Sequence, residues 1–156
     1  MYKKILAPLD GSELAECSLQ HVKAVAAGCE VPEVVLLRVV EPLSSLAYTA
    51  YAEMNGEWLV RMEEEEKKRA RDYIVKMAAG LKEEGIAAQG VMVSGRAADE
   101  ILEYANKNQV DLIIMSTHGR SGISRWAFGS VADRVVRHSK VPVLLVPAPS
   151  CRISPA

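Results

Sequence analysis

The sequence predicts an α/β fold with three αβα layers, in which one parallel sheet lies between two layers of helices. Short apolar runs rich in β-branched residues alternate with longer amphipathic segments along the chain. The run at residues 33–40 is apolar on both faces, which is typical of a parallel strand covered by helices on each side. The 156 residues fit one domain, so we expect a single domain over residues 1–156, with five strands joined by right-handed crossovers.

The first strand, turn and helix are expected within the first 28 residues. An apolar run at residues 3–9 predicts the strand, and the turn cluster Asp10-Gly11-Ser12 closes it. Apolar residues then recur at helical intervals as far as Gly28, where we expect the helix to end. Ser12 is the expected N-cap of this helix, because a serine hydroxyl accepts from the first unpaired backbone N–H groups.

The segment 41–57 has no clear period and is longer than a usual connection, so we expect a loop. Two interpretations stay open, a lid or partner-contact loop and a plain surface excursion. Strands and helices alternate again after it. The expected elements are a long helix at 58–84, a strand at 87–93, a helix at 96–106, a strand at 111–115, a helix at 129–138 and a strand at 141–146.

Composition and charge exclude several classes of protein. The chain has 19 Lys and Arg against 20 Asp and Glu, a net charge of −1, so it lacks the basic field that holds nucleic acid or an anionic membrane. Aromatic residues make up 5%, too few for a platform that stacks bases. The longest apolar runs are far shorter than the ~20 residues needed to span a bilayer.

Three cysteines are present, an odd number without CxxC spacing. Cys17 and Cys29, if they share one helix, lie ~18 Å apart at about 1.5 Å per residue. They are too far apart to pair, and we therefore expect a protein of the reducing cytoplasm. Pro8 and Asp10 interrupt the apolar start of the chain, so a first strand is expected there and not a secretory signal.

In an open parallel sheet, ligands bind beyond the carboxyl ends of the strands, and residues 8–12, 39–41 and 116–130 are expected there. The segment 116–130 follows an apolar strand, contains glycines and leads into a helix. Backbone N–H groups at a helix start hold phosphate oxygens, and glycines permit their close approach. Ser130 can donate its hydroxyl at the helix start, and two arginines can add charge at the rim, Arg120 and Arg125. Alternatively, the glycines only form turns and Ser130 is an N-cap.

The start of the chain at residues 3–12, the run Leu36-Leu37-Arg38-Val39 and residues 115–146 together resemble the universal stress protein family (UspA-like) over essentially the whole chain. The ATP-binding branch of that family carries G-x2-G-x9-G-[S/T] after the fourth strand. Gly119, Gly129 and Ser130 match this motif, whereas Ser116 stands at the first glycine position. A serine there keeps the loop shape if its φ is negative, and costs roughly 1 kcal/mol or more if φ must be positive.

This resemblance implies an adenine nucleotide alpha hydrolase-like fold and a bound ATP, with Mg²⁺ or Mn²⁺ held mainly through phosphate oxygens and water. The implied residues divide between the two ends of the nucleotide. The adenosine is expected against Pro8, Leu9, Asp10 and Val39, the triphosphate on Ser116, Gly119, Gly129, Ser130 and Val131, and Met115, His118 and Arg120 beside them. For Asp10 the alternative is a turn-forming residue before Gly11.

We therefore expect a homodimeric, cytoplasmic ATP-binding protein that acts as a nucleotide-dependent signalling or protective module in stress response. In the strand order 3-2-1-4-5, which we expect, the strand from Val141 to Val146 is an apolar edge, and in the resembling family it pairs with its two-fold copy. Two other classes stay open, a nucleotide-free dimerisation module and a weak ATPase or phosphotransferase. The three histidines lack zinc spacing and no catalytic base is recognisable, so at most slow hydrolysis is expected.

Overall fold

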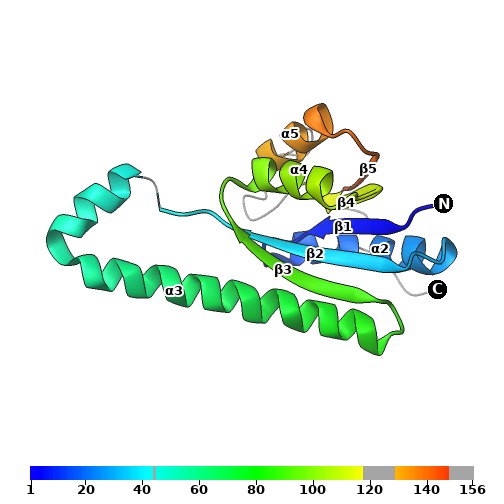
Figure 1. The fold of residues 1–156 in the computed structure, drawn as a ribbon, viewed down its shortest axis with the longest axis horizontal. Helices are drawn as coiled ribbons and strands as arrows, with labels where there is room; N and C mark the ends of the chain where they lie inside the picture. The colour runs from blue at the N-terminus through cyan, green and yellow to red at the C-terminus, as the bar shows by residue number, and fades with distance from the viewer. Residues whose placement is uncertain (44, 118–128, 148–156) are drawn as a thin grey trace.

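The computed structural model describes residues 1–43, 45–117 and 129–147, which form a five-stranded parallel sheet with helices on both faces (Figure 1). The strands lie in the order β3-β2-β1-β4-β5, which confirms the predicted order and fold class. Each strand begins and ends within two residues of its prediction. The bounds are β1 Lys4–Pro8, β2 Glu33–Val40, β3 Ala88–Ser94, β4 Leu112–Ser116 and β5 Val143–Val146.

The central strand β1 is fixed at both of its ends. At its start, the Asp111 carboxylate accepts from the backbone N–H groups of Lys3 at 2.7 Å and Lys4 at 2.9 Å. At its end, the Leu9 N–H donates to the Leu37 carbonyl of β2 at 2.9 Å. Because β1, β2 and β4 are parallel, their carboxyl ends meet at one edge of the sheet.

The first helix is divided into α1, Glu13–Glu16, and α2, Ser18–Gly28, where the sequence predicted one helix. The N-cap prediction is confirmed, because the Ser12 hydroxyl accepts from the Ala15 N–H at 3.1 Å. At the division, the Ser18 hydroxyl donates to the Ala15 carbonyl at 2.7 Å. A serine that bonds back to the preceding turn competes with the regular helix ladder, and this accounts for the interruption.

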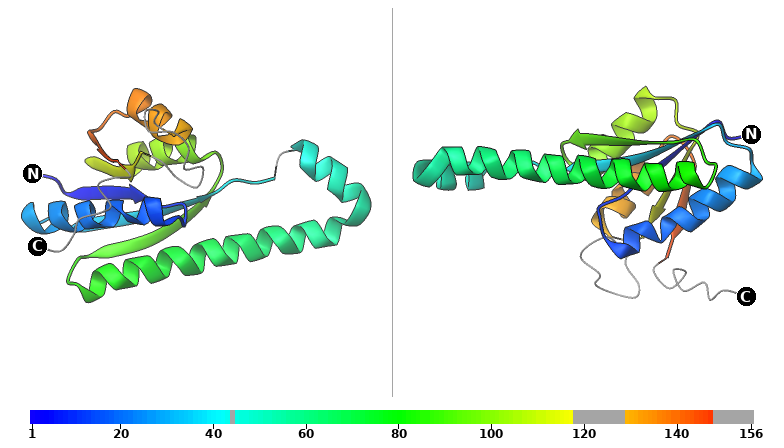
Figure 2. Two further views of the ribbon diagram at one scale, coloured as in Figure 1. Left: turned by 180° about the vertical axis from the view of Figure 1, so that it is seen from behind. Right: turned by 90° about the horizontal axis from the view of Figure 1, so that it is seen from below.

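Helices α1, α2 and α3, Ser45–Glu83, cover one face of the sheet, and α4, Ala97–Lys107, and α5, Ser130–His138, cover the other (Figures 1 and 2). Successive side chains of a strand point to opposite faces, so each strand serves both layers. In β2, Leu36 packs with the α2 and α3 residues, whereas Leu37 packs with those of α4 and α5. Because β2 is buried on both faces, its sequence is an almost continuous apolar run.

The prediction of a loop at 41–57 is wrong from residue 45 onward, because α3 runs without interruption over Ser45–Glu83. Its first part projects beyond the sheet (Figures 1 and 2). A helix shows an apolar period only where one of its sides is buried, so this part has no such period. The segment still contains several good helix formers and no proline after residue 42, which favours a helix.

The end of α3 lies one residue from its prediction, and Gly85 follows the helix as its stop. Gly85 has φ +83°, and its N–H donates to the Lys82 carbonyl at 2.9 Å while the Ile86 N–H donates to the Leu81 carbonyl at 3.0 Å. This pair of hydrogen bonds is a Schellman motif, in which glycine accommodates the left-handed backbone. The chain then turns back into β3 alongside α3.

Cys29 is a free thiol, so the pair Cys17–Cys29 is absent as expected. Cys17 is nevertheless disulfide-bonded, a bond that the sequence did not predict. Spacing along one helix excludes only the pair Cys17–Cys29 and carries no information about contacts made by the fold. None of the described helices has the length and apolar character of a membrane-spanning segment.

Candidate functional site

A cavity of about 270 Å³ lies at the carboxyl ends of β1, β2 and β4, where the sheet rule predicts a ligand. Its walls come from the strand ends and from the first turns of α4 and α5. The lining residues are Pro8, Leu9, Asp10, Ala15, Leu37, Arg38, Val39, Ala97, Ile101, Met115, Ser116, Thr117, Gly129, Ser130, Val131 and Ala132. The site is thus a mainly apolar hollow with a few polar groups, as is usual for small-molecule sites.

The structure brings together every predicted site residue that it describes. These residues, which all line the cavity, are Pro8, Leu9, Asp10, Val39, Met115, Ser116, Gly129, Ser130 and Val131. The other three predicted residues, His118, Gly119 and Arg120, lie outside the described residues, as does Arg125. Segments as far apart in the chain as residues 8–10 and 129–131 therefore meet at one place.

Asp10 forms a turn with Ser12, which is the alternative role that the sequence allowed for this residue. Its Oδ1 accepts from the Ser12 N–H at 2.9 Å and from the Ser12 hydroxyl at 2.5 Å. The same Ser12 hydroxyl caps α1. This chain of hydrogen bonds fixes the loop after β1, so Asp10 both shapes the loop and lines the cavity.

Ser116, the departure from the glycine motif, is the last residue of β4 and pairs with Val146 of β5. Among the described residues, the only non-glycine positions with positive φ are Glu30 and Gln109. Ser116 therefore sits in its strand without the backbone strain that a left-handed position would impose. Its side chain is 8% exposed and lies at the cavity wall.

The N-terminus of α5 opens into the cavity without a side-chain cap from the described residues. Gly129 is the N-cap residue, so the alternative that Ser130 is the N-cap is wrong, and Ser130 is the first helical residue. The Gly129 N–H donates to the Thr117 carbonyl at 2.7 Å, which ties the helix start to the end of β4. The first bond within the helix joins the Asp133 N–H to the Gly129 carbonyl at 2.9 Å. The N–H groups of residues 130–132 therefore have no partner inside the helix.

Arg38 is a buried cavity residue that the sequence reasoning did not select. It is 8% exposed, its Nη1 donates to the Val39 carbonyl at 3.2 Å, and its Nη2 lies 3.7 Å from the Glu66 carboxylate of α3. A single charged residue inside the apolar run of β2 was the available signal. Ala97, Ile101 and Ala132 carried no comparable signal, because they reach the cavity only through the packing of α4 and α5.

Tyr73 of α3 joins α1 to α3 close to Asp10 and Arg38. Its hydroxyl donates to the Glu16 carboxylate at 2.9 Å. Burial is the main cause that raises the pKa of Tyr73 well above its usual value, and the neighbouring Glu16 and Asp10 carboxylates raise it further. Tyr73 therefore stays neutral and keeps donating at ordinary pH, which holds α1 beside the cavity.

Comparison with known proteins gives consistent matches over almost the whole chain. A family model described as the universal stress protein family matches residues 1–147. The universal stress protein MJ0531 of Methanocaldococcus jannaschii is 36% identical over 151 residues, which are 96% of this chain and 84% of that protein.

Two solved structures have the same fold. That of MJ0577 from the same organism superposes with a TM-score of 0.80 at 32% identity, covering 94% of this chain and 96% of that chain. A universal stress protein from Archaeoglobus fulgidus in complex with dAMP superposes with a TM-score of 0.57 at 18% identity. The match covers 93% of this chain and 97% of that chain. The second likeness is evidence for the fold alone.

Proposed function

The chain belongs to the universal stress protein family, and on this premise we propose that it binds ATP at the cavity between β1, β2, β4 and α5 and acts as a nucleotide-dependent module in stress response. The chain shares its fold with a universal stress protein that was solved in complex with dAMP, an adenine nucleotide. ATP is a metabolite of the cytoplasm, so the proposal also implies that compartment.

The start of α5, which no described side chain caps, is the observation that carries this proposal. Three N–H groups with no partner inside the helix, together with the positive end of the helix dipole, form a binding place for phosphate oxygens. Gly129, Ser130 and Val131 supply this wall, and Ser116 lies across from them at the end of β4. Gly119 belongs to the proposed phosphate end by resemblance to the family motif, and His118 and Arg120 are proposed beside it.

The other walls of the cavity suit an adenosine. Pro8, Leu9 and Val39 offer apolar side chains and backbone polar groups to the adenosine. Asp10 provides a carboxylate at the end of β1. Met115 adds a polarizable wall that adapts to a flat ring. A divalent cation, when bound, would neutralise phosphate charge and would be held through phosphate oxygens and water.

Binding would act on the protein by a population shift. ATP contacts residues of β1, β2, β4 and α5 at once, so it favours the conformations in which these elements are closed around it. The surface that surrounds the site, including the segment that links β2 to α3, would then differ between the ATP-bound and free states. A partner that distinguishes the two surfaces would receive the signal.

The direct test is to denature the purified protein and assay the released nucleotide by its absorbance at 260 nm and by chromatography. ATP added to the nucleotide-free protein at 100 times its Kd should stabilise the fold by about 2.7 kcal/mol, a rise in Tm of roughly 5–11 °C. A preparation that carries no adenine nucleotide and shows no ATP-dependent rise in Tm contradicts the proposal.

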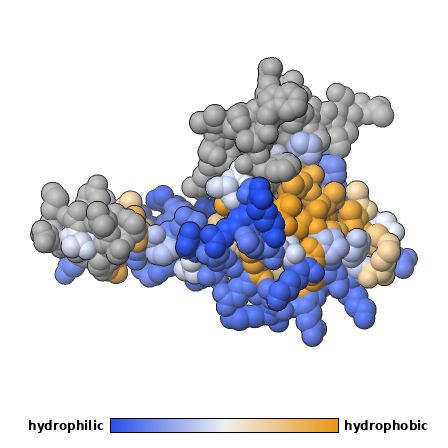
Figure 3. Space-filling model, turned by 90° about the horizontal axis from the view of Figure 1, so that it is seen from above, coloured by the Kyte–Doolittle hydropathy of each residue, from blue (hydrophilic) through white to orange (hydrophobic). Residues whose placement is uncertain are grey.

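We further propose a homodimer formed through β5, because this strand is the outer edge of the sheet. Apolar residues gather on the face that carries α5 and β5 (Figure 3). Leu144 of β5 is 37% exposed, and an apolar edge strand invites pairing with another chain. Pro142 precedes the strand and removes one N–H donor, which limits the length of such a pairing.

Replacing Leu144 by lysine should convert the dimer to a monomer, because it places a charge at the centre of the paired edge. Sedimentation equilibrium at micromolar concentration measures the change in mass. Val75→Lys is the matched control, since Val75 is 53% exposed on α3, away from β5, and should leave the dimer intact. A wild-type protein that is monomeric at this concentration rules out the proposed homodimer.

A further inference from the structure

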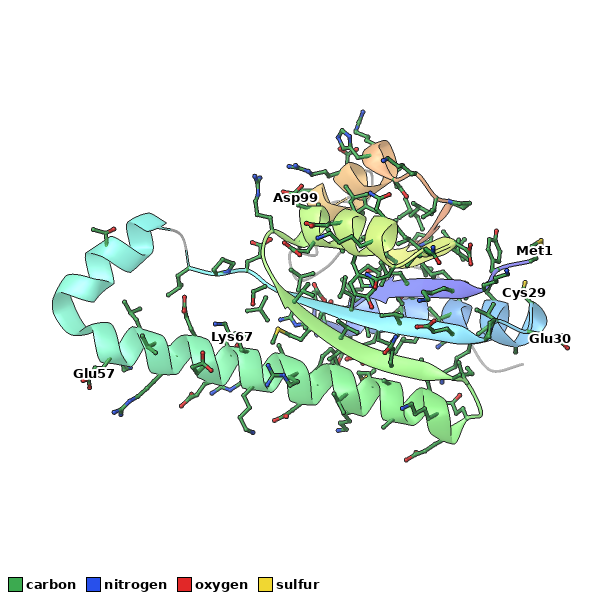
Figure 4. All side chains as sticks on the ribbon, in the orientation of Figure 1. Met1, Cys29, Glu30, Glu57, Lys67 and Asp99 are labelled. Carbon is green, nitrogen blue, oxygen red and sulfur yellow. The ribbon has the colours of Figure 1, made fainter. Side chains whose placement is uncertain are left out.

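A second cavity, of about 470 Å³, lies between α3 and the chain that leaves β2, and shares no lining residue with the first. Its volume falls within the range of about 300–1,000 Å³ that is usual for small-molecule sites. One wall is the segment from Val40 to Leu43, and the other is the stretch of α3 from Trp58 to Lys67. Figure 4 labels Lys67, which marks this stretch of the helix.

The apolar part of this cavity consists of large side chains that the fold leaves accessible. Trp58 is 50% exposed, Met62 44% and Leu43 43%, and all three line the cavity. Leu59, which is buried, forms its floor. A tryptophan face and a flexible thioether together accommodate flat or branched apolar groups of varied shape.

The charged part of the cavity is predominantly acidic. Glu41, Glu63 and Glu66 line it, and Lys67 is the one basic side chain among its lining residues. Glu41 accepts from the Ala97 N–H at 3.0 Å, and Glu66 lies 3.7 Å from Arg38. An excess of carboxylates beside a tryptophan favours a cation over a neutral or anionic group.

Glu63 is the carboxylate best placed to meet such a cation. Within the described part of the chain it makes no hydrogen bond or ion pair, whereas Lys67, one helical turn further on, pairs with Glu64 at 3.6 Å. Glu63 and Met62 both line the cavity, so an acceptor and an apolar wall border the same space. The cavity thus combines a place for an apolar group with a place for an ammonium group.

We propose that this second cavity is a binding site for amphipathic organic cations, that is, molecules with an aromatic or branched apolar group and a primary amine. The apolar group lies against Trp58 and Met62, and the amine pairs with Glu63. The two cavities share no lining residue, so this proposal does not rest on the proposed ATP site.

The test uses three probes that share one apolar group and differ in charge: 4-phenylbutylamine, 4-phenylbutanol and 4-phenylbutyrate. The chain has two tryptophans, so the full-length Trp126→Phe variant leaves Trp58 as the only fluorescent indole. Titration of its emission should show saturable binding of the amine, at least about tenfold tighter than that of the carboxylate, a difference of about 1.4 kcal/mol.

Glu63→Gln, made in the same background, should remove the preference for the amine over the alcohol and leave the affinity for the alcohol unchanged. Glu65→Gln is the matched control on the same helix, because Glu65 pairs with Arg69 at 3.3 Å and does not line the cavity. Three results would overturn the proposal: no saturable change with any probe, equal affinity for amine and carboxylate, or a preference that survives Glu63→Gln. The Tm of each variant, measured without probe, separates a lost site from a lost fold.

Discussion

Replacing Gly129 by valine should abolish ATP binding and leave the fold intact. Gly129 lines the cavity and is the N-cap of α5, next to the N–H groups proposed to hold phosphate. Its backbone has φ −58° and ψ 150°, which valine adopts without strain, so the bond to the Thr117 carbonyl can persist. The branched side chain would occupy space that the phosphates need. We expect a loss of affinity of at least about 100-fold, about 2.7 kcal/mol, by titration calorimetry.

The matched control for this variant is Gly28→Val at the last residue of α2. A Cβ added at Gly28 meets no atom within 4 Å, and Gly28 does not line the cavity. This control should bind ATP as the wild type does. An unchanged Tm of Gly129→Val without nucleotide assigns the loss of binding to the site. Wild-type affinity in Gly129→Val would mean that ATP binds elsewhere or in another orientation.

Replacing Gly90 by alanine should strongly destabilise the fold, because the backbones of β3 and α3 leave no room for a side chain there. An added Cβ would lie 2.5 Å from the carbonyl oxygen of Ile74 and 2.7 Å from its carbonyl carbon. Both atoms belong to the helix backbone, and the Ile74 side chain is fully buried, so neither element can retreat cheaply. We expect a loss of about 3 kcal/mol, the upper end of overpacking costs, measured by urea unfolding.

Gly80→Ala is the matched control on α3 and should have the opposite sign. Its added Cβ meets no atom within 4 Å, and alanine is favoured over glycine inside a helix by roughly 0.5–1 kcal/mol. The pair separates close packing from the general effect of removing a glycine. If Gly90→Ala were as stable as the wild type, β3 and α3 would have to lie further apart than they do here.

Periodicity in the sequence predicted the elements that are buried on the sheet and failed where burial ends. β2 was predicted with its exact bounds, because helices cover both of its faces. The start of α3 was not predicted correctly, because the part of the helix that projects beyond the sheet needs no apolar side. The division at Ser18 was missed for a different reason, since a single side-chain hydrogen bond leaves no trace in an apolar period.

The site was predictable where two general rules apply: ligands bind beyond the carboxyl ends of parallel strands, and certain residue types form turns there. Asp10 follows the apolar strand β1, and Gly129 precedes the helix α5. Both lie at the carboxyl edge of the sheet, and the structure brings them to one cavity. Ala97 and Ile101 were not predictable, because their place in the wall depends on how α4 packs on the sheet. Arg38 was visible as a charge inside an apolar strand, but its contact with Glu66 of α3 required the fold.

The length of α3 determines how the protein moves through solution. Its 39 residues, at about 1.5 Å each, have a contour length of about 58 Å. A compact domain of this size has a radius of gyration of about 15 Å, so a helix that projects from it increases the friction of the particle out of proportion to its mass. A monomer would therefore elute earlier from a sizing column than a compact domain of the same mass. Only measurements of mass, such as sedimentation equilibrium or light scattering, can decide its oligomeric state.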